Sequence, residues 1–233
     1  MLRNHDAFYL NEDNTNVKES FIRVADKLPD GFSGSICDIG CATGAFPAYL
    51  TKRFAEARVT GLEIRHDLLE KAKSDFAFVN FLPGDITNPK TIDRTYDVIT
   101  MLGVLCIFDD YQKIIKNAAN CLNAKGLLIL HNMVSEFDID VFVKYRKSSA
   151  IFDEEQLESG WNIISRNSLV AAAELSGLQL LEIDDFKLSV DLLPTTHDAL
   201  RSWTEKNALG EREIFNGLHL RQPQKVVVFQ KID

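Results

Sequence analysis

Short apolar runs alternate along this chain with stretches in which apolar residues recur at helical spacing. The short runs lie at residues 36–39, 58–64, 78–86, 96–105, 127–130, 178–183 and 225–231. The helical stretches lie at residues 17–28, 46–54, 67–72, 111–122 and 169–175. Apolar runs of this length are typical of parallel strands that are buried on both faces. Strands and helices that alternate in this way predict an α/β fold.

The first apolar run leads into a loop of small residues. Gly40 and Gly44 bracket this loop, and apolar residues at helical spacing begin at Phe46. The unit predicts a strand, a tight loop and a helix, where a ligand approaches the backbone and the helix N-terminus. A larger, β-branched side chain at either glycine is expected to occupy space that the ligand needs and to strain the backbone angle. The Gly-x-Ala-x-Gly pattern differs from the Gly-x-Gly-x-x-Gly of dinucleotide folds, and an ordinary nucleotide-binding turn or a purely structural turn is the alternative.

Three acids stand at the ends of the first three predicted strands. Asp38 lies two residues before Gly40, and its burial is costly unless a cation, such as a ligand ammonium, meets it. Glu63 follows the glycine loop by about twenty residues, where a carboxylate suits the two hydroxyls of a ribose. NAD-binding folds use the same device, and a helix-capping acid is the other interpretation of Glu63. Asp85 ends the third run in a Gly-Asp pair.

Two of these segments resemble motifs of a known family. The segment Ile36 to Phe46 resembles the first motif of class I S-adenosylmethionine-dependent methyltransferases, with Ala42 where a middle glycine is commoner. The segment Tyr96 to Leu105 resembles the fourth motif of that family. The resemblance implies a doubly wound, mostly parallel seven-stranded sheet, the Rossmann-like methyltransferase fold. It also implies that the final strand, at 225–231, is antiparallel and lies between the fifth and sixth strands.

The resemblance further implies S-adenosyl-L-methionine as the cofactor and S-adenosyl-L-homocysteine as the product. In this family the acid matching Asp85 accepts a hydrogen bond from the adenine amino group, and the residue matching Ile86 packs on the ring. The residues expected to bind the cofactor are Asp38, Gly40, Cys41, Ala42, Gly44, Glu63, Ile64, Asp85, Ile86 and Leu102.

The residues that would act on the acceptor are less clearly marked. Cys106 and Ile107 stand where many relatives carry Glu-His, so one candidate base is missing. His131 is the remaining candidate, because it is expected to end the fifth strand at the ligand edge and an isolated imidazole titrates at about pH 6.5. A histidine bonded to neighbouring backbone is the alternative. Asp97, at the start of the fourth strand, is interpreted as structural.

The chain is expected to form one domain over residues 1–233. Its N-terminal segment, about residues 1–34, is interpreted as loosely held and polar up to residue 14 and as helical afterwards. Insertions at about 133–164 and 191–223, the first with an amphipathic pattern, are expected to form a substrate cap. Tyr9 is a candidate lid residue, although simple packing is the alternative. Candidates for the pocket wall are Tyr145, Arg146, Trp161 and Trp203, with Arg146 also a candidate partner of an anionic acceptor.

Composition narrows the range of partners. The chain has 233 residues, 45% of them hydrophobic, and a net charge of -8 at pH 7. Its acidity argues against non-specific nucleic-acid binding, and no apolar run approaches the ~20 residues of a membrane span. The N-terminus lacks a signal-peptide core. The four cysteines form no Cys-x-x-Cys pair, so no metal site is expected, and they fit the reduced core residues of a cytoplasmic protein.

These observations together predict an enzyme that transfers a methyl group from S-adenosylmethionine to an oxygen or nitrogen of a small-molecule acceptor. The sequence Met101-Leu102-Gly103-Val104 lacks the Asn/Asp-Pro-Pro-Tyr motif of related enzymes that methylate amino groups of nucleobases, which disfavours such a substrate. One alternative is a non-catalytic adenosyl-binding protein of the same fold. Another alternative is an NAD-dependent oxidoreductase. The missing Gly-x-Gly-x-x-Gly pattern and the presence of Asp85 argue against it. Aminopropyl transfer shares the fold, but no acidic substrate signature is seen.

Overall fold

A central sheet with helices on both faces forms the body of the protein. The structure, a computed structural model, describes residues 5–11, 16–146, 157–195, 198 and 200–233. The sheet consists of β1 (Ser35–Ile39), β2 (Arg58–Glu63), β3 (Asn80–Pro83), β4 (Tyr96–Leu102), β5 (Leu122–Ser135), β8 (Ile164–Ser165), β9 (Leu178–Asp185) and β12 (Gln224–Lys231). The helices are α1 (Glu19–Ala25), α2 (Ala45–Arg53), α3 (His66–Asp75), α4 (Tyr111–Asn120) and α5 (Arg166–Glu174), with 3-10 turns η1 (His5–Asn11), η2 (Pro89–Thr91) and η3 (Leu105–Ile107).

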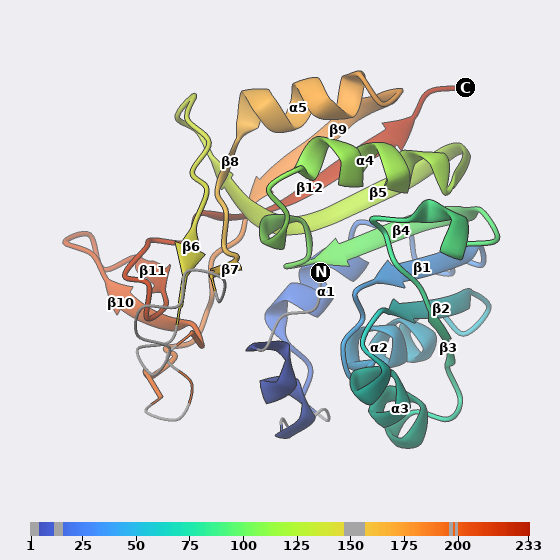
Figure 1. Cartoon of the computed structure of the whole chain (residues 1–233), viewed down its shortest axis with the longest axis horizontal. Coiled ribbons are helices and arrows are strands. Elements are labelled where there is room, and N and C mark those ends of the chain that lie inside the picture. The colour runs from blue at the N-terminus through green and yellow to red at the C-terminus, as the bar shows by residue number, and fades with distance from the viewer. Residues whose placement is uncertain (1–4, 12–15, 147–156, 196–197, 199) are drawn as a thin grey trace.

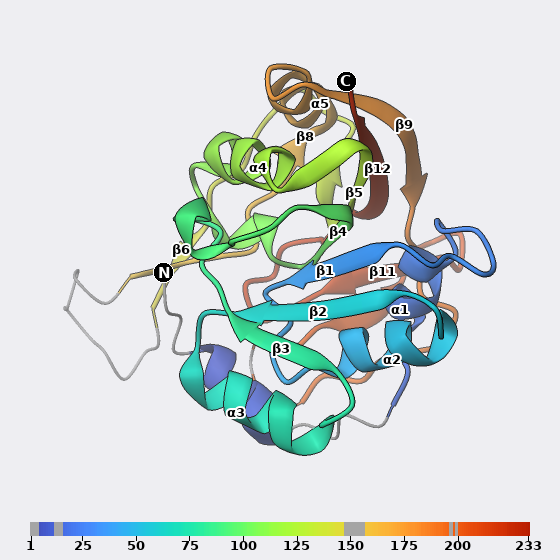
Figure 2. The ribbon, with the colours of Figure 1, turned by 90° about the vertical axis from the view of Figure 1, so that its right-hand side faces the viewer.

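The strand order confirms the predicted fold. Seven strands follow the order β3-β2-β1-β4-β5-β12-β9, which Figure 2 shows from β3 upward, and β8 pairs beside β5. The strands from β3 to β5 pair in parallel, so their carboxyl ends meet at one edge. The final strand, β12, is antiparallel and inserted as predicted, with Val227 opposite Leu130 of β5 and Ile183 of β9. The third strand ends at Pro83, earlier than predicted, because Asp85 and Thr87 form a turn.

Two layers of buried apolar side chains hold the helices to the sheet. Because neighbouring residues of a strand face opposite sides, Ile99 belongs to the core beneath α4 and α5, whereas Val98 belongs to the core beneath α1 and α2. Figures 1 and 2 show these helix pairs on opposite faces of the sheet. Ile115 and Leu169 fill the first layer, and Leu50 fills the second; all three are fully buried.

Two hairpins gather at the end of the molecule to which the parallel strands point (Figure 1). One pairs β6 (Lys144–Tyr145) with β7 (Glu158–Ser159), and the other pairs β10 (Trp203–Lys206) with β11 (Arg212–Phe215). β5 continues through Ser135 and pairs there with β8, so the sheet includes the first residues of the predicted first insertion. Residues 147–156 of that insertion lie outside the described residues.

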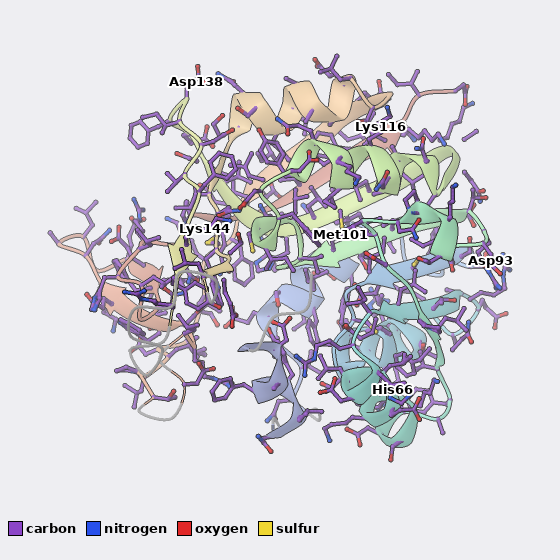
Figure 3. All side chains as sticks on the ribbon, in the orientation of Figure 1. His66, Asp93, Met101, Lys116, Asp138 and Lys144 are labelled. Carbon is purple, nitrogen blue, oxygen red and sulfur yellow. The ribbon has the colours of Figure 1, made fainter. Side chains whose placement is uncertain are left out.

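Two aspartates anchor the first hairpin to the body. Asp140 accepts hydrogen bonds from the Tyr111 hydroxyl at 2.8 Å and from the Ser165 N–H at 2.7 Å. Asp109, just before α4, pairs with Lys144 of β6 and accepts from Asn162 Nδ2 at 3.1 Å. In Figure 3 Lys144 lies beside the hairpins, whereas Asp93 lies at the opposite end of the molecule. The base of this hairpin is therefore tied to the sheet layer.

The N-terminal segment differs from its prediction. Residues 5–11, expected to be loosely held, form the 3-10 helix η1, which lies against α3. Residues 1–4 and 12–15 lie outside the described residues. The helix predicted over 17–28 is confirmed as the shorter α1. As predicted for reduced core residues, all four cysteines are free and buried.

Candidate functional site

A cavity of about 200 Å³ opens where the first four parallel strands end. Its wall contains every residue predicted to bind the cofactor except Gly44: Asp38, Gly40, Cys41, Ala42, Glu63, Ile64, Asp85, Ile86 and Leu102. The carboxyl edge of an open α/β sheet is where such folds bind their ligands. Residues far apart in the sequence thus meet around one space, and their binding roles stay predictions.

Asp38 lies at the floor of this cavity with little access to solvent. Its side chain is 4% exposed, and Oδ1 accepts a hydrogen bond from Thr100 Oγ1 at 2.7 Å. Burial raises the pKa of Asp38 to about 7; the bond from Thr100 opposes this rise and the charge of Glu63 adds to it. An opposite charge nearby stabilises the ionised form of a buried carboxylate. Asp38 therefore fits the ammonium group of an amino-acid ligand.

Glu63 ties the glycine loop to the start of α3. Its Oε1 accepts from the N–H groups of Ile64 and Arg65, and its Oε2 accepts from the N–H of Ala42, all at 2.9 Å. Burial raises the pKa of Glu63, and these three backbone bonds oppose the rise. An ionised carboxylate has about four acceptor positions, so capacity remains for a ribose hydroxyl. The two interpretations of Glu63, a capping acid and a ribose ligand, are therefore compatible.

We expect Glu63→Ala to weaken binding of S-adenosylhomocysteine by about 2–3 kcal/mol, because charged hydrogen bonds are lost. The same change should lower the melting temperature, since three backbone N–H groups lose their acceptor. Calorimetric titration and thermal melting measure the two effects. Glu63→Gln is the matched control, because it keeps one acceptor oxygen and should lose less stability. Unchanged affinity in a folded Glu63→Ala protein would remove Glu63 from the site.

The backbone angles and the packing of the protein require glycine at both loop positions. Gly40 and Gly44 have φ angles of +71° and +83°. A Cβ atom at Gly40 would lie 2.7 Å from Val104 Cγ2, and one at Gly44 would lie 2.5 Å from Phe81 Cζ. At Gly44, which does not line the cavity, a larger side chain would meet packed atoms instead of the space expected for the ligand. At Gly40, which lines the cavity together with Val104, the expected loss of ligand space stays a prediction. The positive φ angles fit the expected strain on a larger residue. Ala42 also has a positive φ, of 48°, so the loop carries some strain.

We expect Gly44→Ala to destabilise the fold by about 2–4 kcal/mol, through left-handed strain and a clash with the buried ring of Phe81. Gly31→Ala is the matched control: Gly31 has a φ of +75° but no described atom within 4 Å of a new Cβ. It should lose only about 1–2 kcal/mol from the φ angle. Urea unfolding compares the two variants. Equal losses would show that packing against Phe81 is not the reason for this glycine.

Asp85 holds the turn after β3. Its Oδ1 accepts from the N–H and hydroxyl of Thr87 at 2.8 and 2.7 Å, and its own N–H donates to Thr91 Oγ1 at 2.9 Å. Beside it, Ile86 is buried at 5% exposure, and the Ile86 carbonyl accepts from Asn117 of α4. The turn therefore presents an acidic and an apolar side chain to the cavity, the pair predicted to hold a purine ring.

A second cavity, of about 690 Å³, adjoins the first. The two cavities share the residues Tyr9, Lys18, Phe21, Leu102 and Gly103. The other walls of the second cavity come from β5, the start of β12, η3 and the region after β9. The arrangement places the cavity that holds the three strand-end acids beside a larger one.

His131 lines the second cavity, but its predicted setting is wrong in two respects. It does not end its strand, since β5 continues to Ser135 and pairs with β12 at Val226. Burial lowers the pKa of His131 to about 4, against a weaker raising effect from Gln224, so it does not titrate near 6.5. Its Nε2 has no hydrogen-bond partner among the described residues. The role of His131 as a general base stays a prediction, and His131 would enter the reaction as a neutral imidazole.

Only part of the predicted cap faces the cavities. Trp161 lines the second cavity, and its ring packs at an angle of 59° to that of Tyr145, with 5.7 Å between the centroids. Tyr145 bonds to Glu158 and does not line the cavity. Arg146 is exposed, and neither it nor Trp203 lines a described cavity. Asp97 accepts from Ser35 and Asn123 at the far end of β4, which fits its structural interpretation.

Several lining residues carry no clear signal in the sequence. Thr100 reaches Asp38 from the neighbouring strand, 62 residues away. Asp6 reaches the first cavity from η1, where the polar sequence has no helical pattern. Tyr9, the candidate lid residue, lines both cavities from the same element. Phe108 also lines the first cavity. Its position just after the fourth motif could have marked it as a candidate.

Within the described part of the chain, no group of three or more His, Cys, Asp or Glu residues is placed to hold a metal ion. The helices that the structure describes are too short or too polar to cross a membrane.

Comparison with known proteins supports the same interpretation of the fold. A family model described as a methyltransferase domain matches residues 9–183. Malonyl-[acyl-carrier protein] O-methyltransferase 1 of Ilyobacter polytropus is 26% identical over 167 residues, which are 65% of this chain and 60% of that protein. (S)-coclaurine N-methyltransferase of Thalictrum flavum is 25% identical over 136 residues, 54% of this chain and 37% of that protein. The chain thus matches less than two thirds of the length of these relatives.

Solved structures show the same fold. A methyltransferase in complex with the Haloferax volcanii Trm112 activator superposes with a TM-score of 0.66 and 14% identity, covering 100% of both chains. Coclaurine N-methyltransferase bound to N-methylheliamine and S-adenosylhomocysteine superposes with a TM-score of 0.57 and 19% identity, covering 76% of this chain and 54% of that one. With the family model matching most of the sequence, the predicted family is confirmed: the chain belongs to the class I S-adenosylmethionine-dependent methyltransferases.

Proposed function

We propose that this protein transfers a methyl group from S-adenosylmethionine to a small-molecule acceptor. The observation that carries the proposal is the pair of adjoining cavities, one with three strand-end acids and one with mainly apolar walls. The relatives named above are an O-methyltransferase of malonyl-[acyl-carrier protein] and an N-methyltransferase of (S)-coclaurine, which supports methylation without naming the acceptor here.

The residues of the first cavity fit the cofactor. Asp38 is a buried carboxylate suited to an ammonium, Glu63 offers acceptor positions to a ribose, and Asp85 with Ile86 suits an adenine. When bound, the cofactor supplies a methyl group that its sulfonium has already activated. The chain then has to orient the acceptor and exclude water. Leu102 and Gly103, shared by both cavities, mark where the two ligands would meet.

The cap is part of the proposal. Residues of the two insertions, Trp161 from the first and Leu192, Leu193 and Ile214 from the second, line the larger cavity. Tyr9 joins them from the N-terminal segment, with Lys18 Nζ 5.9 Å from its ring centre. We propose that these parts form a cover over the acceptor within a single domain. The four free cysteines support a cytoplasmic location.

A labelled-methyl assay tests the proposed function. The protein is incubated with tritiated-methyl S-adenosylmethionine and a small-molecule extract, and the products are separated and identified by mass spectrometry. A labelled small molecule is expected, formed only with active protein. Tight cofactor binding without transfer across many extracts would favour a non-catalytic adenosyl-binding protein. Binding of NAD in preference to S-adenosylhomocysteine would favour an oxidoreductase.

A further inference from the structure

Three residues that line the second cavity have a buried polar atom with no hydrogen-bond partner among the described residues. The atoms are Nε2 of His131, Nε2 of Gln222 and Oδ1 of Asn132. Buried polar side chains are nearly always satisfied in folded proteins, so such atoms need an explanation.

A short chain of amides lies beside His131. A hydrogen bond with the Gln224 side chain opposes the fall in the pKa of His131 that burial causes, and Nε2 of His131 has no partner within the described structure. Gln224 Nε2 donates to Gln222 Oε1 at 3.2 Å. Ser202 Oγ donates to the same Gln222 oxygen at 3.0 Å. A His131 tautomer with its proton on Nδ1, and so a free lone pair on Nε2, fits these contacts.

Apolar side chains form part of the wall beside the imidazole. The Phe186 ring packs edge-on against the imidazole with 4.6 Å between centroids. Further walls come from Met133, Trp161, Leu188, Leu192 and Ile214. The charged residues of the cavity lie elsewhere: Lys18 and Glu19 are at α1, and Asp198 and Arg201 are in the segment before β10. Burial keeps His131 neutral by lowering its pKa to about 4, and it would disfavour an ammonium or carboxylate at the same point.

We propose that the second cavity binds an uncharged acceptor with a hydroxyl group on a largely apolar body, the hydroxyl donating to His131 Nε2. The Gln222 N–H group is left to donate to an oxygen of the same ligand. This inference rests on the proposed methyl transfer and names its acceptor class. In the transfer, a C–O bond forms to the methyl carbon, the C–S bond breaks with its electron pair staying on sulfur, and the hydroxyl proton passes to Nε2. Gln224 and Gln222 are positioning residues.

Three matched probes test the class: 2-naphthol, naphthalene and 2-naphthoate, titrated into the protein loaded with S-adenosylhomocysteine. We expect 2-naphthol to bind about tenfold more tightly than either other probe, as one buried hydrogen bond predicts. His131→Ala should remove the preference over naphthalene. Phe137→Ala is the control, because Phe137 is 78% exposed and lies outside the cavity wall. An equal or better affinity for 2-naphthoate, or a preference that survives His131→Ala, would overturn the inference.

Nitrogen NMR of the unmodified protein tests the geometry without any variant. With labelled histidine, we expect His131 to carry its proton on Nδ1, and 2-naphthol to shift the Nε2 resonance. Gln224→Glu should raise the pKa of His131 by placing a carboxylate beside Nδ1, an effect that a purely structural glutamine would not have. A proton on Nε2, or no Nε2 shift, would overturn the inference. If S-adenosylhomocysteine fails to bind, the proposed function fails, and the same probes on the ligand-free protein still test the cavity.

Discussion

Asp38→Asn is expected to weaken binding of S-adenosylmethionine by about 2–5 kcal/mol, because the ligand ammonium loses a buried opposite charge. The same variant should be more stable than the wild type when no ligand is present at pH 8. The reason is that the wild type then holds a buried carboxylate, whereas asparagine can keep the bond from Thr100 without a charge. Calorimetry and thermal melting measure the two opposite effects.

The pH dependence of Asp38 has a definite sign. The pKa of Asp38 in the folded protein is raised from 3.8 to about 7. The stability that its bound proton contributes is complete below 3.8 and is lost as pH rises through about 7. The stabilising effect of Asp38→Asn should therefore grow between these values. Because the ammonium needs the carboxylate, wild-type affinity should be about tenfold weaker at pH 6 than at pH 8, with proton release on binding.

Asp97→Asn is the matched control for this prediction. Asp97 is also an acid on a central strand, but it lies at the amino end of β4 and accepts from Ser35 and Asn123. Those bonds lower the pKa of Asp97, so its replacement should reduce stability and leave cofactor affinity unchanged. If Asp38→Asn binds the cofactor normally, or if its affinity keeps the wild-type pH dependence, Asp38 is not the ammonium partner.

His131→Ala is expected to cut turnover by roughly 10²–10⁴ while leaving cofactor affinity intact, the range for a group that takes a proton from the acceptor. Because burial lowers the pKa of His131 to about 4, any acidic limb due to His131 should lie near pH 4. A change in the pH–rate profile near pH 7 should instead come from Asp38, and it should appear as a change in the KM for the cofactor. Steady-state kinetics across pH separate the two groups.

His66→Ala serves as the control for this change. His66 begins α3, is exposed, and lies far from the hairpins in Figure 3. Its replacement should leave turnover unchanged. Near-wild-type turnover of His131→Ala with the true acceptor would assign His131 to structure, and orientation of the acceptor alone would then carry the reaction.

The cofactor cavity could be predicted from the sequence because its signals are local. Asp38, Glu63 and Asp85 each follow an apolar run directly, and parallel strands bring their ends to one edge. The role of Gly44 was misjudged, since its close neighbour Phe81 lies on another strand. The chain itself carries no mark of such a contact, so only the three-dimensional structure reveals why glycine is needed there.

The acceptor side could not be predicted as well, because it depends on contacts between distant segments. The polar pair after Leu130 suggested a strand end, yet pairing with β12 extends β5 through His131 to Ser135. Gln222 and Gln224 are unremarkable in a polar segment, and only the fold brings Gln224 to the imidazole. The hairpins likewise rest on strands of two to four residues, too short for a periodic pattern.

A crystal structure of the complex with S-adenosylhomocysteine tests the central claim most directly. The account predicts the ligand in the first cavity, with its ammonium within hydrogen-bond distance of Asp38 and its ribose hydroxyls on Glu63. The adenine should lie between Asp85 and Ile86, and the sulfur should face the second cavity near Leu102 and Gly103. A ligand bound elsewhere, or bound in this cavity with its ammonium away from Asp38, would contradict the account.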